Sequence, residues 1–189
     1  FSSLTSEEFI VFLESELPGT ADAVRAEEWL YGAGMPAGAP VFRSDRLEEL
    51  IAAAEAFAGG SRPAQDLIEG WKPNELLIFL QHLPRSLDRE SLEWLDRTFK
   101  LTARGNYEIL VEWLTIASGS DYEPVFDRLR EVLLQVGRMK YLRPLYAALG
   151  GHARTRALAR DIYSHARLNY HVLSRRVAES VMEKYSRER

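Results

Sequence analysis

The 189-residue chain contains no cysteine. This absence excludes disulfide bonds, zinc sites built from thiolates, and cysteine nucleophiles. No apolar run approaches the ~20 residues that a membrane-spanning helix requires, so the sequence predicts neither a transmembrane segment nor a membrane partner. The chain starts at Phe1 rather than at methionine and shows no signal-peptide pattern. We therefore expect that a leader has been removed or that the chain belongs to a longer protein.

Motifs for self-contained enzymatic chemistry are also missing. None of the four histidines is followed by glutamate, as the His-Glu-x-x-His pattern of helical zinc sites requires. His165 and His171 are six residues apart, about 240° around a regular helix, so one helix cannot direct both at the same ion. The sequence also lacks Gly-x-Ser-x-Gly and a glycine-rich phosphate loop. We expect no cofactor or metal site in this chain, and we interpret His82, His152, His165 and His171 as surface or structural residues.

Charge is spread unevenly along the chain. The net charge is −4 overall, but residues from His152 onward carry 9 basic against 4 acidic side chains. The arginines are distributed along ordinary helical sequence, without an RNA-binding signature or a pattern of stacking aromatics. Nucleic-acid binding is therefore not expected, and the basic end is interpreted as a solvated helix face that can meet an acidic partner surface.

Helix signals dominate what remains. Thr5–Glu8 forms a capping box in front of an apolar stripe that includes Phe9, Ile10, Phe12 and Leu13. Gly59-Gly60, Gly105 and Gly137 are interpreted as helix ends. Ser120–Glu123 resembles a second capping box, and Pro73 and Pro144 suit the first turn of a helix. We expect helices at 46–58, 74–83, 88–104, 106–117, 120–136, 144–149 and 153–185, the last broken near Asn169.

These spacings predict an all-α fold. Strand-like alternation is nowhere sustained, and 46% hydrophobic residues are enough to bury a core. About nine helices with short connections favour stacked antiparallel helical hairpins that form an armadillo-like α-α superhelix. We predict that residues 1–40 hold a first helix and a Gly/Pro-rich connecting loop, and that residues 41–189 form the main helical domain. The four tryptophans (Trp29, Trp71, Trp94 and Trp113) are expected to pack in the core.

The stretch from Gly137 to Leu145 differs from the rest of the chain. It contains the sequence Gly-Arg-Met-Lys-Tyr-Leu-Arg-Pro-Leu, in which Arg138 and Lys140 are expected to fall in a tight turn between two helices. In a turn both cations can converge on one point near the N-terminus of the next helix, where free amides favour an anion. A guanidinium there can bind a carboxylate through two parallel hydrogen bonds. The pattern is consistent with a carboxylate site, although such arginines also cap helix carbonyls.

The same stretch resembles the C-terminal domain of leukotriene A(4) hydrolase and related gluzincin aminopeptidases, in which a Gly-Arg-Met-Lys-aromatic-x-Arg-Pro-Leu sequence recurs. Other stretches of the chain are also similar to that domain: 28–36, 106–109, 113–114, 170–172 and 177–178. Two positions depart from the family pattern, because Met35 stands for leucine and Val172 follows His171 without an intervening proline. Neither departure touches Arg138 or Lys140.

The resemblance implies a role within a larger enzyme. In this family a β domain and a zinc-bearing catalytic domain precede the helical domain, and the zinc ligands belong to the catalytic domain. Zinc is therefore expected in that missing domain, and the catalytic domain of its own full-length chain and short peptide substrates are the expected partners. The family arginine and lysine that match Arg138 and Lys140 anchor the free carboxylate of a short peptide. The isolated chain is predicted to be inactive.

Two alternatives remain open from the sequence. A non-catalytic helical-repeat scaffold for protein–protein interaction would explain stacked hairpins equally well. A self-sufficient hydrolase is the other alternative, although the sequence shows none of the motifs for it. The N-terminal residue preference, an accompanying epoxide hydrolase activity, the oligomeric state and the superhelix curvature stay undetermined. The compartment also stays open, with the cytoplasm slightly favoured.

Overall fold

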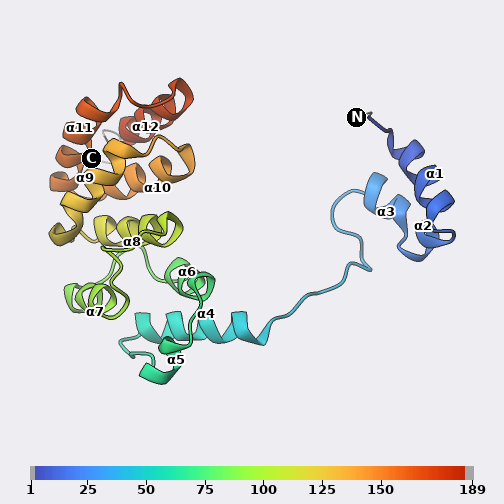
Figure 1. The fold of residues 1–189 in the computed structure, drawn as a ribbon, viewed down its shortest axis with the longest axis horizontal. Helices are drawn as coiled ribbons and strands as arrows, with labels where there is room; N and C mark the ends of the chain where they lie inside the picture. Colours follow the sequence, from blue (N-terminus) through green and yellow to red (C-terminus); the bar gives the residue numbers. More distant parts are fainter. Residues whose placement is uncertain (1–2, 186–189) are drawn as a thin grey trace. The chain divides into compact units, whose positions relative to one another are not determined.

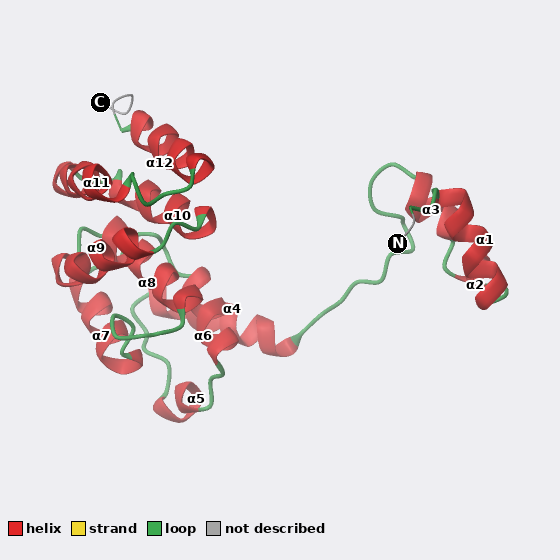
Figure 2. Cartoon of the chain, turned by 45° about the horizontal axis from the view of Figure 1, so that its top comes forward, coloured by secondary structure: helices red, strands yellow, loops and turns green. Residues whose placement is uncertain are grey.

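The computed structural model describes residues 3–185. This part of the chain holds twelve α-helices and one 3-10 helix and no strand, and nine of the α-helices have seven residues or more (Figures 1 and 2). The prediction of an all-α fold with about nine helices is confirmed. The chain divides into two compact units, an N-terminal unit, Phe1–Ser44, and a C-terminal unit, Asp45–Arg189.

The N-terminal unit contains three helices: α1 (Ser6–Glu16), α2 (Thr20–Ala23) and α3 (Ala26–Tyr31). The predicted capping box is confirmed, because Glu8 N–H donates to Thr5 Oγ1 and Thr5 N–H donates to Glu8 Oε2. The Glu14 carboxylate accepts N–H bonds from the next turn at 2.8 and 2.6 Å, and these bonds lower its pKa. The Tyr31 hydroxyl donates to Glu7 at 2.8 Å and joins α3 to α1.

The N-terminal unit has almost no core of its own. Ala26 is its one buried hydrophobic residue among those that the structure describes. Large apolar side chains are exposed instead: Leu4, Phe9, Val11, Phe12, Leu17, Val24, Trp29, Leu30, Tyr31, Met35, Val41 and Phe42. The expectation that Trp29 packs in a core is therefore wrong for this structure, since 48% of its surface is accessible.

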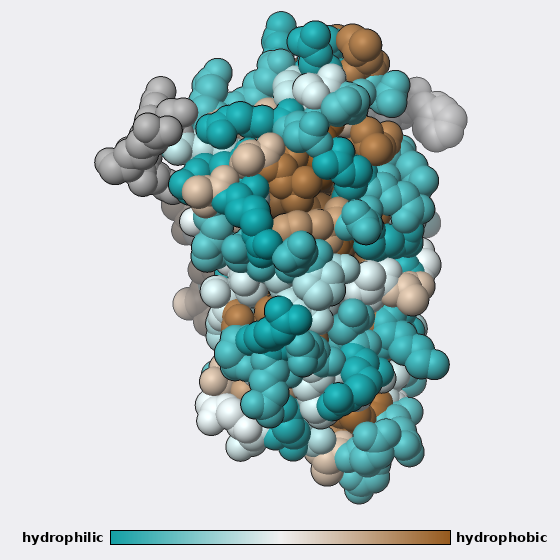
Figure 3. All heavy atoms as spheres, turned by 90° about the vertical axis from the view of Figure 1, so that its left-hand side faces the viewer, coloured by the Kyte–Doolittle hydropathy of each residue, from teal (hydrophilic) through white to brown (hydrophobic). Residues whose placement is uncertain are grey.

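The C-terminal unit contains the remaining helices: α4 (Asp45–Ala58), α5 (Gln65–Glu69), α6 (Pro73–Gln81), α7 (Arg89–Phe99), α8 (Tyr107–Gly119), η1 (Glu123–Val125), α9 (Phe126–Gln135), α10 (Met139–Leu149), α11 (Ala153–Ala166) and α12 (Val172–Lys184). Helices α4, α6, α8, α10 and α12 pack in that order, each against the next, and α9 packs against α11 (Figure 1). The face that carries α7, α9 and α11 is largely hydrophilic, with hydrophobic side chains gathered in small patches (Figure 3).

The core of this unit lies between the series α4, α6, α8, α10 and α12 and the helices α7, α9 and α11. Helix α8 is its centre, because most of its side chains between Ile109 and Ser118 are buried. Trp113 is fully buried, and its indole N–H donates to Thr102 Oγ1 at 2.9 Å. Trp71 and Trp94 are partly buried against the same core, so core packing is confirmed for these three tryptophans. By contrast Leu47 of α4 is 40% exposed.

The predicted end of α7 and the predicted start of α9 were wrong for identifiable reasons. Helix α7 ends at Phe99 because Lys100 adopts a left-handed backbone conformation, with φ 50°. The Ser120 hydroxyl does not cap a helix; it donates to the Ile116 carbonyl and accepts the Leu87 N–H. The following helix α9 begins only at Phe126, after a 3-10 turn. Elsewhere the expected break near Asn169 is confirmed, between α11 and α12.

The N-cap of α7 gives a pH-dependent prediction. Asp88 accepts the backbone N–H and the hydroxyl of Ser91, both at 2.8 Å, and these bonds lower its pKa. A depressed folded-state pKa contributes stability above the unfolded value of about 3.9, and this stability is lost as the pH falls through the folded pKa. We expect Asp88→Ala to cost about 1 kcal/mol at pH 7 and much less near pH 2, as measured by urea unfolding. The control Asp88→Asn, which keeps an acceptor oxygen, should lose less at pH 7; equal losses at both pH values would contradict the assignment.

Candidate functional site

The candidate site lies at the N-terminus of α10. Arg138 is the N-cap residue, and its carbonyl accepts the N–H groups of Tyr141 and Leu142 at 2.9 and 3.1 Å. Lys140 therefore lies in the first helical turn. The expectation that both Arg138 and Lys140 belong to an interhelix turn is correct for the connection at Arg138 and wrong for Lys140.

Pro144 does not start this helix, as the sequence suggested, but lies inside it. Its missing N–H leaves the Lys140 carbonyl without the usual helical bond, and an interior proline costs about 3 kcal/mol. Among the four fully buried side chains of α10, Leu142 lies before Pro144, and its burial contributes roughly 1.5–3 kcal/mol against this cost. The other three, Leu145, Tyr146 and Leu149, follow the proline. Tertiary packing thus extends the helix back to Met139.

Lys140 is held by a carboxylate from the neighbouring helix α8. Its Nζ lies 2.7 and 2.6 Å from the two carboxylate oxygens of Glu108, and the Tyr141 hydroxyl donates to the same carboxylate at 2.9 Å. The hydrogen bonds from Lys140 lower the pKa of Glu108 most, and the hydrogen bond from Tyr141 lowers it next. The positive charge of Arg138 makes a smaller contribution in the same direction. Glu108 is therefore ionised at neutral pH and offsets the charge of Lys140.

Arg138 is less engaged than Lys140. Its Cζ lies 5.2 Å from the centre of the Tyr141 ring, and one guanidinium nitrogen lies 3.4 Å from the Tyr141 hydroxyl oxygen. The Nζ of Lys140 lies 5.9 Å from the same ring centre, so both cations rest on one aromatic side chain. Arg138 is exposed. A guanidinium has five N–H donors, and within residues 3–185 most of those of Arg138 have no partner and can meet a ligand.

Sequence reasoning missed the two residues that organise this site. Glu108 precedes Lys140 by 32 positions, so no local spacing indicated their pairing. Tyr141 was noted only as part of the Gly137–Leu145 stretch, yet it contacts both cations and the carboxylate, and its ring stacks on Tyr107 with centres 6.1 Å apart. Only the packing of α8 against α10 brings these groups together.

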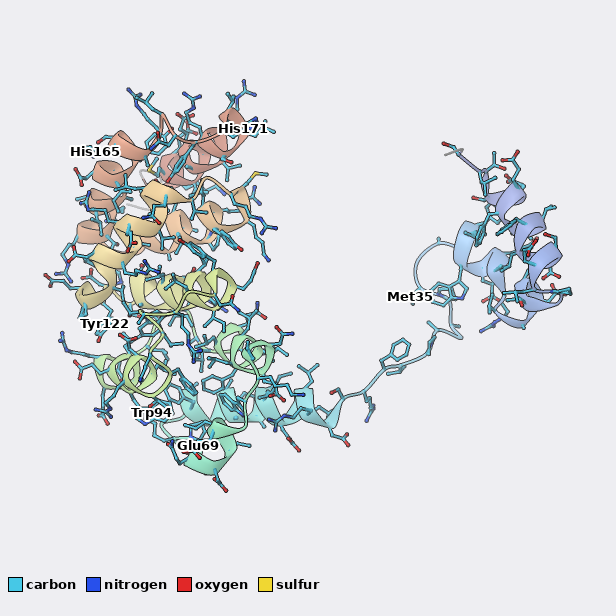
Figure 4. The ribbon with its side chains drawn as sticks, in the orientation of Figure 1. Met35, Glu69, Trp94, Tyr122, His165 and His171 are labelled. Atoms are coloured by element: carbon cyan, nitrogen blue, oxygen red, sulfur yellow. The ribbon has the colours of Figure 1, made fainter. Side chains whose placement is uncertain are left out.

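The four histidines contact the backbone. His82 and His165 place Nδ1 2.8 Å from carbonyls one turn earlier, and His152 Nε2 lies 3.0 Å from the Gly119 carbonyl. His171 accepts the Leu173 N–H and caps α12, while His165 lies on α11 (Figure 4). All four histidines are exposed and hydrogen-bonded to the backbone, which agrees with their interpretation as surface or structural residues. Across residues 3–185 no three His, Asp or Glu side chains come together as a metal-binding group, so the described residues do not fit a zinc ion. No helix in that range is long and apolar enough to cross a membrane.

The stacked helical hairpins and the cation pair at one helix N-terminus define an all-α domain with a candidate anion-binding end. Residues 71–182, more than half of the chain, match the family described as leukotriene A4 hydrolase, C-terminal. The chain belongs to this family. It is 29% identical over 189 residues to leucine aminopeptidase 2 of Pyricularia oryzae and 27% identical over 183 residues to aminopeptidase B of Mus musculus.

The fold is shared with a solved structure. Native yeast LTA4 hydrolase superposes with a TM-score of 0.72 at 19% identity, over 94% of this chain and 32% of the yeast chain. The two aminopeptidases are matched over 94% and 87% of this chain, but only over 30% and 28% of their own lengths. The chain thus spans less than a third of the relatives that it matches, and it corresponds to their C-terminal domain.

Proposed function

We propose that this chain is the C-terminal domain of a zinc-dependent aminopeptidase, and that it contributes recognition of the substrate's carboxylate rather than the metal chemistry. The observation that carries the proposal is family membership, together with relatives that are named as aminopeptidases and match nearly the whole chain. The zinc would be held outside this sequence, because the described residues offer no group of ligands for it. Zinc in such enzymes activates a water molecule and polarises the scissile carbonyl.

Arg138 is the residue that we assign to the carboxylate of a short peptide. Its guanidinium is exposed beside the first turn of α10, where the helix dipole favours an anion. A two-bond grip fixes the orientation of the peptide, and a fixed end-group aligns the scissile bond with a distant metal.

Lys140 has a smaller assigned role in this arrangement. Because Glu108 already offsets its charge, Lys140 supports the position of Tyr141 and Arg138 and adds little net attraction of its own. The sequence-based expectation placed Lys140 beside Arg138 at the carboxylate, and the pairing with Glu108 gives Lys140 a smaller part in that proposal.

The partner proposed for the N-terminal unit is the catalytic domain of the full-length chain. The apolar side chains of this unit, such as Phe9, Phe12, Trp29 and Leu30, are at least 40% exposed in the part of the chain that the structure describes. Exposed apolar patches of this kind mark interaction surfaces. A larger domain that covers them would also bring zinc chemistry within reach of the same chain.

The proposed function is tested by comparing two proteins. We expect the 189-residue chain to cleave no aminoacyl-coumarin reporter and to hold no stoichiometric zinc. The full-length protein should cleave the reporter and should hold zinc. The measurements are fluorescence release and atomic absorption. Cleavage by the 189-residue chain alone would identify a self-sufficient hydrolase. A full-length protein without zinc and without cleavage would instead identify a helical-repeat scaffold, and either result would reject the proposal.

A further inference from the structure

A second group of cations lies where α10 packs against α12. Arg143 of α10 and Arg176 and Lys184 of α12 line one pocket with a volume of about 650 Å³. Pockets between 300 and 1,000 Å³ are typical of small-molecule sites. Arg143 and Arg176 are solvent-exposed, as is Lys184, so all three can reach a ligand in this pocket.

These three cations have no partner in the range 3–185. None of them forms a hydrogen bond, an ion pair or a cation–π contact there, whereas Arg46, Arg85, Arg128, Arg130 and Arg154 each bind a carboxylate. Like charges that share a pocket repel one another, and an anion between them removes that repulsion.

The contrast is sharpest along the layer of helices to which α10 and α12 belong. Each earlier junction carries a cation paired with a carboxylate from the neighbouring helix: Arg46 with Glu75 between α4 and α6, Arg85 with Glu112 beside α6 and α8, and Lys140 with Glu108 between α8 and α10. A pocket of about 640 Å³ between α8 and α10 also contains its own neutralised pair, Arg85 and Glu112. Within the described residues, the junction of α10 with α12 has cations and no carboxylate partner.

Apart from Ser180, the rest of the pocket lining is mostly apolar. Ala147, Val177 and Val181 contribute aliphatic surface beside the three cations, and the Tyr185 ring closes the pocket. Tyr185 is held in place because its hydroxyl donates to the Tyr146 carbonyl and its ring lies against Gly150. A side chain at Gly150 would come within 2.7 Å of that ring. The lining therefore combines a cationic part and a fixed apolar part.

We propose that this pocket binds a small amphipathic anion, whose phosphate or carboxylate head contacts Arg143, Arg176 and Lys184 and whose short apolar chain lies on Ala147, Val177 and Val181. The two parts of the ligand match the two parts of the lining. Charged hydrogen bonds from two guanidinium groups and one ammonium select the head. The aliphatic surface selects a chain rather than a bare ion. The site is separate from Arg138 and needs no peptidase activity, so its test does not depend on the proposed function.

The test uses three probes and isothermal titration calorimetry on the 189-residue chain. Hexyl phosphate carries both the head and the chain, inorganic phosphate carries the head alone, and hexanol carries the chain alone. We expect hexyl phosphate to bind at least ten times more tightly than inorganic phosphate, and hexanol to give no measurable heat. Equal affinities of hexyl phosphate and inorganic phosphate would overturn the proposal, as would no binding of hexyl phosphate at millimolar concentration.

Two substitutions and one control connect the binding to these residues. Arg143→Gln and Arg176→Gln should each weaken hexyl phosphate binding at least tenfold. Arg97→Gln removes the same charge from an exposed position on α7 and should leave the affinity unchanged. Circular dichroism checks that each variant keeps the helical content of the parent chain. Equal losses in all three variants would show a general charge effect and would reject the site.

Two further measurements distinguish a lipid head group from a free metabolite as the ligand. Cosedimentation with phosphatidylcholine vesicles that contain phosphatidic acid, lost in Arg176→Gln, would assign a lipid head group; its absence alongside hexyl phosphate binding would assign a free metabolite. The full-length protein should bind hexyl phosphate as tightly as the 189-residue chain does. Loss of binding in the full-length protein would mean that another domain covers the pocket, and it would overturn the proposal.

Discussion

Replacing Trp113 by alanine is expected to lower the free energy of unfolding of the C-terminal unit by about 3–5 kcal/mol. Trp113 is the largest fully buried side chain of the core. The substitution leaves a cavity in the middle of α8 that its close-packed neighbours cannot fill. It also removes the indole N–H that donates to Thr102 Oγ1, whose hydroxyl donates in turn to the Asp96 carboxylate at 2.8 Å. These two hydrogen bonds stabilise the turn in which the chain reverses direction after α7.

Two controls separate this effect from the loss of any tryptophan. Trp113→Phe keeps most of the ring volume and should cost clearly less than the alanine variant. Trp29→Ala removes the exposed tryptophan of α3 and should change stability by less than about 0.5 kcal/mol in this chain. Urea unfolding followed by circular dichroism measures all three. Similar losses for Trp113→Ala and Trp29→Ala would show that Trp113 does not hold the core as the structure indicates.

The second large effect concerns catalysis by the full-length enzyme. Arg138→Ala should lower kcat/KM for tripeptides with a free carboxyl end by about 10- to 100-fold, because hydrogen bonds to a charged group are worth roughly 1.5–3 kcal/mol. Both KM and kcat should change, since the anchor also aligns the scissile bond. Lys140→Ala should have a smaller effect, because Glu108 already offsets the charge of Lys140.

The discriminating readout is a pair of substrates. A tripeptide with an amidated C-terminus lacks the carboxylate, so Arg138→Ala and the parent enzyme should hydrolyse it at similar rates. Arg97→Ala, which removes an exposed arginine from α7, is the matched control and should affect neither substrate. Zinc content should be the same in all variants. Unchanged kinetics of Arg138→Ala with the free tripeptide would remove the anchoring role from Arg138.

Local sequence signals were sufficient where neighbours along the chain decide the structure. The Thr5–Glu8 capping box formed as predicted because its donors and acceptors are three residues apart. The break near Asn169 and the start of α6 at Pro73 follow from equally short-range preferences. The Ser120–Glu123 pattern has the same letters as a capping box, yet the Ser120 hydroxyl binds the backbone at Ile116 and Leu87. The hydroxyl is already engaged by the Ile116 carbonyl one turn earlier and by the Leu87 N–H in a distant loop, so it cannot cap the next helix.

The candidate site shows a similar division. The Gly137–Leu145 stretch identified Arg138 and Lys140 by resemblance, and the structure places both against the Tyr141 ring. The sequence could not predict that Glu108 would form an ion pair with Lys140, because the two residues meet only when α8 packs on α10. Arg143 and Arg176, which have no partner within residues 3–185, could not be predicted to share a pocket for the same reason, because they meet only when α10 packs on α12.

By itself, the sequence determined the all-α class, most of the helices and the relation to a known family, because helix periodicity, caps and a contiguous motif are properties of neighbouring residues. The tertiary structure alone decided which cations are neutralised, how far α10 extends through Pro144, and where a pocket opens between α10 and α12. Those features depend on side chains that are more than thirty positions apart in several cases. Packing brings such residues together, and the free energy of that packing outweighs local preference.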